Sequence, residues 1–183
     1  MRRSILLSLF LGVSALLPAP EQAFATSVVT LTDAELVQFS DVIAHVTILS
    51  VEPFRFDENI ILTRITAQVN ECLKSCSGDT IVFYARGGRL DDATQVFHGE
   101  FKPEAGAELV VFLEKIRRYG DKLMVLGLEQ GAFRVLPIPQ SRTNMCLSNA
   151  VIRHTNSRDS AFDASQNVHA LKAAIRSEME HAR

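Results

Sequence analysis

Seven short runs rich in Val, Ile, Phe and Thr follow one another along the middle of this 183-residue chain. β-branched and aromatic residues favour strands, and the Gly, Pro, Asn and Asp residues between the runs favour turns. The connections between the runs are too short for the helix that joins parallel strands. The pattern therefore predicts a mainly β fold, a small antiparallel barrel or sandwich. The predicted strands are residues 42–52, 60–72, 80–84, 94–98, 109–114, 123–128 and 132–136.

Two of these runs predict their own place in the sheet. In residues 60–72, apolar side chains on one face alternate with mostly polar ones on the other, as in a sheet with one solvated side. The dry face consists of Ile61, Thr63, Ile65, Ala67 and Val69. Residues 42–49 are apolar on both faces at several points, which predicts a central strand with a helix or the C-terminal segment over its outer side.

A short helix is predicted before the strands. Thr32 and Glu35 have the spacing of a reciprocal capping box, and Leu31 and Leu36 occupy the staple positions on either side of it. This helix and the strands together form one predicted β-barrel domain, residues 26–136.

The rest of the chain, residues 137–183, is predicted to be an irregular arm and a helix packed on the barrel. Pro, Ser and Asn are frequent in residues 137–162, which favours irregular structure. Asp163 and Gln166 have the spacing of a second capping box, so a helix is expected from Asp163 to His181. Its apolar stripe consists of Val168, Leu171, Ile175 and Met179.

The first twenty-five residues have the three parts of a secretory signal peptide. Met1–Arg3 is basic, residues 5–17 are mostly apolar, and Ala23 and Ala25 form a small-residue cleavage pattern. The apolar run is too short to cross a hydrocarbon core of ~30 Å. We therefore expect an exported chain, periplasmic or secreted, that begins near Thr26 and has no membrane span after cleavage.

Charge is mixed along the chain, which argues against a nucleic-acid partner. Without the predicted signal segment, seventeen basic and twenty acidic residues give a formal charge near −3. Proteins that bind nucleic acids usually have a dominant basic face. The absence of Trp and the presence of only Tyr84 and Tyr119 also weaken interpretations that need aromatic platforms for sugars or bases.

Three cysteines in an exported chain predict one disulfide and one odd thiol. Cys72 and Cys76 flank a short segment between two predicted strands, so a hairpin brings them within bonding range. Such a small loop pins a turn more than it stabilises a domain. The alternative, that both are reduced, stays open. Cys146 is expected to be a buried or partly buried thiol.

An ordered series of short motifs runs through the β region. The motifs are Ser40–Ile43, Ser50–Glu52, Glu71–Lys74, Gly78–Ile81, Gly87–Gly88, Phe101–Pro103, Glu108–Leu113 and Gly127–Val135. Over roughly residues 31–136, their order and spacing resemble a family of uncharacterised exported bacterial proteins. The resemblance implies an OB-type barrel, distantly similar to netrin-like and metalloprotease-inhibitor modules, and it brings no catalytic residues.

This chain departs from the family pattern in two places. It has His45-Val46 where the relatives tend to have a glycine, and the pair Cys72 and Cys76 is not part of the pattern. Local details of the barrel near these positions are therefore expected to differ.

The densest polar region surrounds two adjacent glycines, and it is the candidate ligand-binding site. Glycine lets a backbone approach a ligand closely, and loops commonly carry function. The alternative is a barrel turn that needs positive φ beside solvated charges. The candidate ligand-binding residues are Arg86, Gly87, Gly88, Arg89, Asp92 and His98.

Neither a metal nor a cofactor is predicted. His45 and His98 would need to meet across strands, with Glu100 or Asp92, to hold a metal. No close ligand spacing such as H-E-x-x-H is present, so each histidine is interpreted as a hydrogen-bonded residue of the sheet. The pair Asp91 and Asp92 is interpreted as part of a turn, because it lacks the alternating oxygen ligands of a calcium loop.

The leading hypothesis is an exported, non-enzymatic binding or interaction module with an envelope or extracellular protein as its partner. No G-x-S-x-G or S-x-x-K motif is present to indicate catalysis. One alternative is an inhibitor of a secreted protease, which rests on the distant similarity to inhibitor modules. The other is a hydrolase that uses Cys146 as nucleophile and His154 as base.

Overall fold

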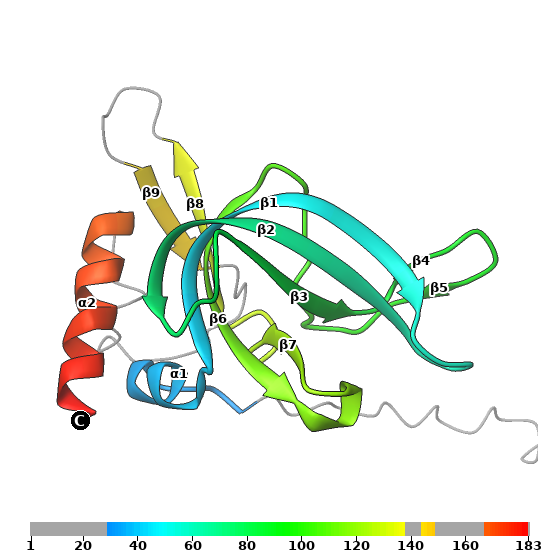
Figure 1. The fold of residues 1–183 in the computed structure, drawn as a ribbon, viewed down its shortest axis with the longest axis horizontal. Helices are drawn as coiled ribbons and strands as arrows, with labels where there is room; N and C mark the ends of the chain where they lie inside the picture. Colours follow the sequence, from blue (N-terminus) through cyan, green and yellow to red (C-terminus); the bar gives the residue numbers. More distant parts are fainter. Residues whose placement is uncertain (1–28, 138–143, 149–166, 183) are drawn as a thin grey trace, which may run out of the picture.

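The computed structural model describes residues 29–137, 144–148 and 167–182, and its centre is a closed ring of five strands (Figure 1). The ring consists of β1 (Val42–Arg55), β2 (Ile61–Lys74), β3 (Thr80–Arg86), β7 (Lys122–Val125) and β6 (Glu108–Ile116), in that order, with β6 pairing back to β1. All neighbours are antiparallel except β3 and β7, which run parallel where Tyr84 pairs with Met124. The predicted mainly β barrel is confirmed, with the strand order of a five-stranded Greek-key barrel.

Two further strands extend the sheet from β6. They are β8 (Ala132–Pro137) and β9 (Asn144–Ser148), which pair with each other, while β8 also pairs with β6. The prediction that residues 137–162 are irregular throughout is therefore wrong at β9. Its polar residues have low strand propensity, but the ladder with β8 satisfies their backbone groups, and that context overrides propensity.

A separate two-stranded ribbon follows β3, and it corrects the predicted strand at residues 94–98. β4 (Gly88–Arg89) pairs only with β5 (Thr94–Gln95), across a turn closed by the Leu90 N–H to the Ala93 carbonyl at 2.8 Å. Residues beyond Gln95 have no strand opposite them, and β-type sequence without a partner does not form a ladder. The predicted strand 123–128 likewise ends at Val125, where a turn begins.

The short N-terminal helix α1 (Asp33–Phe39) forms as predicted. The Thr32 hydroxyl accepts from the Glu35 backbone N–H at 3.2 Å, and a Glu35 carboxylate oxygen accepts from the Thr32 backbone N–H at 2.8 Å. Leu36 is fully buried. Both ends of the predicted capping box are therefore in place, and the helix is fixed against the barrel by its apolar face.

The C-terminal helix α2 (Val168–His181) docks on the barrel as predicted but begins later. Its N-cap is Asn167, whose side-chain oxygen accepts from the Ala170 backbone N–H at 2.9 Å. Asp163 and Gln166, expected to begin the helix, lie outside the described residues. Asparagine in extended conformation is a strong N-cap, so the helix starts at the residue that follows it. The predicted stripe does face the barrel: Val168, Leu171 and Ile175 are buried, and Met179 packs against the same apolar cluster.

β1 is the central strand that the sequence predicts. It pairs with β2 along one edge and with β6 along the other, and α1 and α2 cover one end of the barrel beside it (Figure 1). Ile43 belongs to the apolar cluster shared with the two helices, whereas Ala44 and Val46 belong to the barrel interior. This is why the strand is apolar on both faces.

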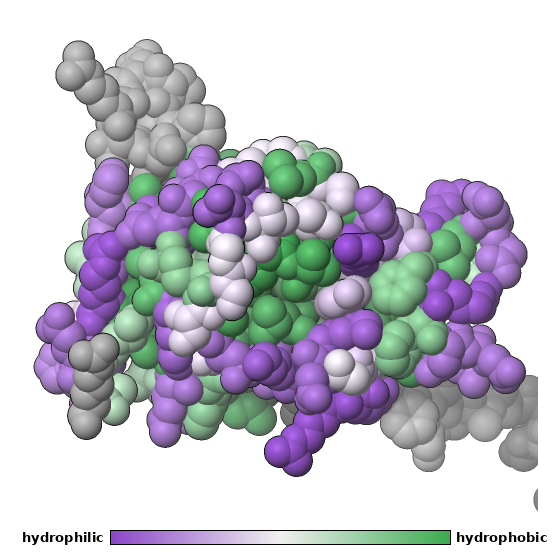
Figure 2. Space-filling view, viewed as in Figure 1, coloured by the Kyte–Doolittle hydropathy of each residue, from purple (hydrophilic) through white to green (hydrophobic). Residues whose placement is uncertain are grey.

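β2 shows the predicted alternation, with one exception. Its dry face is buried from Ile61 to Ala67, and Arg64 and Gln68 on the other face are exposed. Leu62, on the outer face, is fully buried because it belongs to a third apolar cluster with Tyr119 and Met124. On the face of the molecule shown in Figure 2, hydrophobic residues lie between hydrophilic ones.

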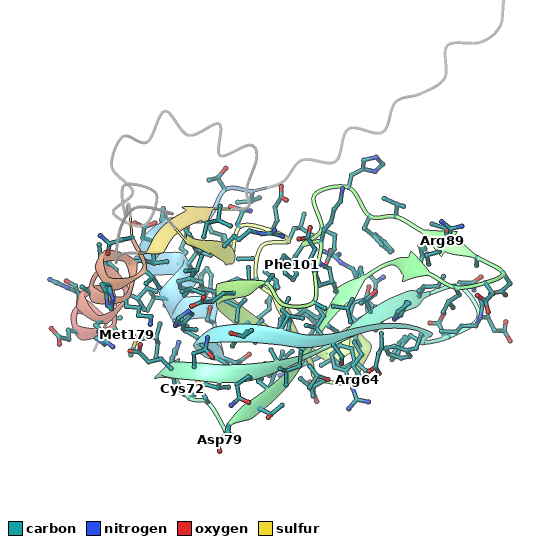
Figure 3. The ribbon with its side chains drawn as sticks, turned by 90° about the horizontal axis from the view of Figure 1, so that it is seen from above. Arg64, Cys72, Asp79, Arg89, Phe101 and Met179 are labelled. Carbon is teal, nitrogen blue, oxygen red and sulfur yellow. A yellow bond between two sulfur atoms is a disulfide. The ribbon has the colours of Figure 1, made fainter. Side chains whose placement is uncertain are left out.

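The predicted disulfide between Cys72 and Cys76 is formed at the end of β2, with the Cα atoms 5.7 Å apart (Figure 3). Lys74, inside this small loop, donates to the carbonyls of Val37 at 2.7 Å and Ser40 at 2.6 Å. A cation therefore lies at the C-terminal end of α1, where it complements the helix dipole. In the part of the chain that the structure describes, no helix is long and apolar enough to cross a membrane.

Candidate functional site

The two adjacent glycines mark a place where two parts of the backbone cross closely. Gly87 and Gly88 have φ values of 87° and 145°. A Cβ at Gly87 would lie 2.5 Å from the Gln95 carbonyl oxygen, and one at Gly88 would lie 2.8 Å from the Thr63 hydroxyl. The Gly87 carbonyl accepts from that Thr63 hydroxyl at 2.7 Å. Gly87 is therefore required by its contact with the backbone of β5, and Gly88 by its contact with side chains of β1 and β2, which supports the alternative of a barrel turn for these two residues.

Arg86 fixes the segment that follows the ribbon. Its Nε donates to one Glu100 carboxylate oxygen at 2.7 Å, and its backbone N–H donates to the other at 3.1 Å. Glu100 is only 5% exposed, and the Arg86 guanidinium lies 5.7 Å from the centroid of the Phe97 ring. A buried carboxylate with two donors is well compensated, so this pair holds residues 97–100 against β3.

Two cavities adjoin at Arg86. The larger, called the Arg86 groove below, has a volume of about 570 Å³, and the smaller has a volume of about 290 Å³. Arg86, Val96 and Phe97 line both. The groove is lined by Val29, Leu31, Arg86, Val96, Phe97, His98, Glu114, Leu126, Gly127, Leu128 and Gln130.

The structure brings five of the six predicted site residues to these cavities. Arg86 and His98 line the groove, and Gly87, Gly88 and Arg89 line the smaller cavity with Arg86. Asp92 lines neither; its carboxylate pairs with Arg55 at 2.6 Å on the exposed end of the ribbon. Arg89, beside the smaller cavity, lies at the end of the molecule opposite Met179 of α2 (Figure 3).

The wall of the groove is built partly from the segment before α1. Gln130, which is buried, accepts from the Leu31 backbone N–H at 2.9 Å and donates to the Val29 carbonyl at 3.0 Å. One glutamine amide therefore holds Val29 and Leu31 along the groove as a neighbouring strand would. The sequence analysis did not identify Gln130 as a site residue, although a glutamine inside an apolar β region is a signal for a buried polar contact.

The floor of the groove contains a strained turn between β7 and β8. Leu128 has a φ of 68°, a left-handed conformation that is unfavourable for a leucine. Gly127 before it has a φ of 63°, and a Cβ there would lie 2.9 Å from Leu31 Cδ1. Such strain is frequent where a loop is shaped for a ligand.

Glu114 is the acid of the groove that the sequence analysis missed. It is half-buried in β6, opposite Met124 of β7, and its carboxylate makes no hydrogen bond or ion pair with any residue that the structure describes. Burial raises the pKa of its carboxyl, the nearby charge of Asp41 raises it further, and Arg86 opposes both effects. Alternating β sequence places an acid at this position without showing what surrounds it, so no sequence signal singles it out.

A second polar cluster joins α2 to the barrel and contains His45. The His45 Nε2 lies 2.6 Å from a Glu108 carboxylate oxygen, and Lys172 Nζ lies 2.8 Å from His45 Nδ1 and 2.6 Å from a Glu71 oxygen. Arg176 also pairs with Glu71. His45 and Lys172 are both buried. Because each ring nitrogen of His45 has a partner, this histidine is the hydrogen-bonded residue of the sheet that the sequence predicts.

Burial lowers the pKa of His45, and the charge of Lys172 lowers it further. The carboxylates of Glu108 and Glu71 oppose both effects, because each raises this pKa. The hydrogen bond from Lys172 lowers the pKa of Glu71. His45 is therefore neutral, with Nε2 donating to Glu108 and Nδ1 accepting from Lys172. We call these four residues and Arg176 the α2 clamp. Among the described residues, no group of three metal-binding side chains is assembled.

Several residues of the sequence hypotheses lie outside the described part of the chain. They include the signal segment, Thr26, and His154, together with the side chain of Cys146. The proposed Cys146–His154 dyad and the predicted cleavage site stay predictions. Compared with protein-family models, with curated proteins and with solved structures, the chain matches none. Membership of the family that the motifs resemble therefore also stays a prediction.

Proposed function

We propose that this protein is an exported, non-enzymatic binding module whose partner occupies the Arg86 groove. The observation that carries the proposal is the groove itself. Its volume of about 570 Å³ lies in the range of ligand sites, and its walls combine apolar side chains with a few polar groups. This combination is typical of sites that bind by apolar contact and orient the bound group by charge.

Two features support export. The N-terminal sequence has the pattern of a secretory signal, and the Cys72–Cys76 disulfide is stable in the oxidising compartments that exported proteins reach. The motif resemblance to exported bacterial proteins agrees with both.

The lining of the groove favours binding over catalysis. Its described residues include no serine, cysteine, threonine or lysine beside a base that would activate it as a nucleophile. Arg86 and Gln130 are engaged by the fold, through Glu100 and through the segment before α1. Their role is to shape the site.

The test is a cross-linked pull-down from the protein's own envelope fraction with wild type and Val96→Arg. Val96 lines the groove and is 67% exposed, so arginine there blocks the groove without entering the core. The matched control is Leu49→Arg, at an apolar residue of β1 that is 54% exposed and does not line the groove.

We expect wild type and Leu49→Arg to capture one partner and Val96→Arg to lose it. This partner should also bind at one site to purified wild type and purified Leu49→Arg, and not to purified Val96→Arg. Equal capture by all three proteins would place binding elsewhere on the surface. Absence of any partner for wild type would contradict a protein-binding role and leave a small ligand as the occupant of the groove.

A further inference from the structure

Two residues of opposite charge, Arg86 and Glu114, line the Arg86 groove. Arg86 is matched by the buried carboxylate of Glu100, which accepts both of its hydrogen bonds. Glu114 lines the same groove, where the charge of Asp41 raises the pKa of its carboxyl and the charge of Arg86 lowers it. His98, on the exposed rim, is the remaining titratable residue of the lining. Glu114 is therefore the one acid among the described residues that line the groove.

The hydrogen-bonding groups of the groove differ in whether the fold provides a partner for them. The Gln130 amide accepts from Leu31 and donates to the carbonyls of Val29 and Gly127. The Arg86 Nε and backbone N–H donate to Glu100. Glu114 has no such partner within the described chain. A half-buried carboxylate that lacks a donor is unfavourable, and a donor from a ligand relieves this cost.

The remaining lining is apolar and mostly aliphatic. Val96 is 67% exposed beside Phe97, and Leu126 and Leu128 belong to the same lining. A ligand that fits this lining has an apolar body a few carbon atoms long and a cationic hydrogen-bond donor at the end that reaches Glu114.

We propose that the Arg86 groove binds an organic amine that the partner carries, whose ammonium group pairs with Glu114 while the apolar body beside it packs against Val96, Phe97 and Leu128. This inference rests on the proposed function, because it requires the groove to be a binding site. A charge-assisted hydrogen bond to the carboxylate provides the orientation, and it is about twice as strong as a neutral one. The carboxylate selects against anions of the same shape.

The experiment compares three probes that share one apolar body. Binding of 2-phenylethylamine, 2-phenylethanol and 3-phenylpropanoate to the purified full chain is measured at neutral pH by calorimetry and by NMR shifts of groove amides. We expect the amine to bind about tenfold more tightly than the alcohol, since one such hydrogen bond is worth roughly that factor, and the carboxylate to bind most weakly.

Two isosteric variants assign the effect. Glu114→Gln keeps the shape of the side chain and removes its charge, so the affinity for the amine should fall to that for the alcohol while the alcohol is unaffected. The control is Glu129→Gln, at another half-buried acid whose pKa is raised by burial but which does not line the groove. It should change the affinity for neither probe.

The outcomes separate this inference from the proposed function. Equal affinities for the amine and the alcohol, or an amine affinity unchanged by Glu114→Gln, would overturn the assignment to amines, while loss of all binding in Val96→Arg would still support the groove as a site. If none of the probes binds at about 10 mM, the inference is wrong, and the pull-down alone decides the proposed function.

Discussion

Gly87 and Gly78 have nearly the same backbone conformation but different surroundings. Their φ values are 87° and 81°, and a Cβ would meet the Gln95 carbonyl oxygen at 2.5 Å in the first and nothing within 4 Å in the second. A substitution at Gly78 therefore reports the strain of a left-handed alanine alone. The same substitution at Gly87 adds the clash with a backbone atom, which no rotation of a side chain relieves.

We predict that Gly78→Ala lowers the free energy of unfolding by about 1 kcal/mol and that Gly87→Ala lowers it by about 2–4 kcal/mol. Urea unfolding followed by circular dichroism measures both. Equal losses would mean that the ribbon shifts away from β3 at little cost, and that the crossing does not depend on Gly87.

Glu100 and Glu114 show how one residue type acquires two roles from its surroundings. Both face Arg86, but the carboxylate of Glu100 is buried and receives two hydrogen bonds, whereas that of Glu114 is half-buried and receives none from the described chain. Glu100 therefore holds the loop, and Glu114 is available to a ligand.

At the scale of elements, the α2 clamp is the polar part of the contact between helix and barrel. The clamp brings β1, β2 and β6 together with α2 through His45, Glu71, Glu108, Lys172 and Arg176. Lys172 donates to His45 only while Nδ1 is unprotonated. Protonation of His45 would place the Nδ1–H donor and the positive charge of its ring against the ammonium group of Lys172. The carboxylates of Glu108 and Glu71 would offset part of this repulsion.

The clamp predicts a pH dependence of stability. Because the pKa of His45 is lowered in the folded protein, the unfolded chain binds its proton at a higher pH, near the ordinary value of 6.5. Stability from His45 is therefore present above about pH 6.5 and is lost as pH falls toward the folded pKa. The pKa of Glu71 is lowered, so its contribution to stability is likewise lost as the pH falls, in the range below about 4.5. The pKa values of Glu114 and Glu129 are raised, so their contributions make the folded protein more stable as the pH falls.

The measurement is the free energy of unfolding between pH 7.5 and 5.5 for wild type and His45→Gln. We expect wild type to lose more stability than the variant over this range. Their difference isolates His45 from the opposing glutamates. A difference that is constant with pH would show that His45 does not titrate differently in the two states.

The disulfide acts on one small element. Closing such a short loop removes limited entropy from the unfolded chain, so Cys72→Ser with Cys76→Ser should cost about 2 kcal/mol or less. The local effect should be larger: Lys74, freed from the constraint, should hold the C-terminal end of α1 less firmly. Hydrogen exchange at residues 37–41 should become faster, while exchange in the core strand β6 should follow only the global stability. Unchanged exchange at residues 37–41 would show that Lys74 holds α1 without the disulfide.

At the scale of the whole molecule, the two ends of the barrel differ. The end beside α2 is closed by helices and by the clamp, and the ribbon end carries Arg89 and the exposed Asp92 (Figure 3). The Arg86 groove lies between these features, because its lining includes Val96 and Phe97 after the ribbon and Leu126 of the apolar cluster that α2 shares.

Export is also a property of the whole chain. Expression of the full chain in its own cell should give a protein whose first residue is Thr26, because the apolar run directs secretion and small residues precede the cleavage point. Mass spectrometry of the envelope and external fractions checks this. Leu11→Arg, which interrupts the apolar run, should leave the chain uncleaved inside the cell. A wild-type chain that keeps Met1 would contradict the proposed export.

The sequence by itself determined the elements whose signals are local. Alternation in β2, the capping box of α1, the stripe of α2 and the Cys72–Cys76 pair depend on residues close together along the chain, and the structure confirms each. The adjacent residues Gly87 and Gly88, and the many polar residues around them, likewise located the loop around Arg86. These features could be predicted because periodicity and capping act over a few residues.

Only the tertiary structure decided what these elements contact. The short ribbon at Gln95, the strand β9 and the helix start at Asn167 depend on which partner strand or cap is present. The groove depends on Gln130 and Glu114, from segments far from Arg86 along the chain. Closure of the ring through the parallel pair β3 and β7 brings these segments together. No local pattern encodes which distant side chains then meet, because the burial and the electrostatic surroundings of a side chain depend on all the residues around it.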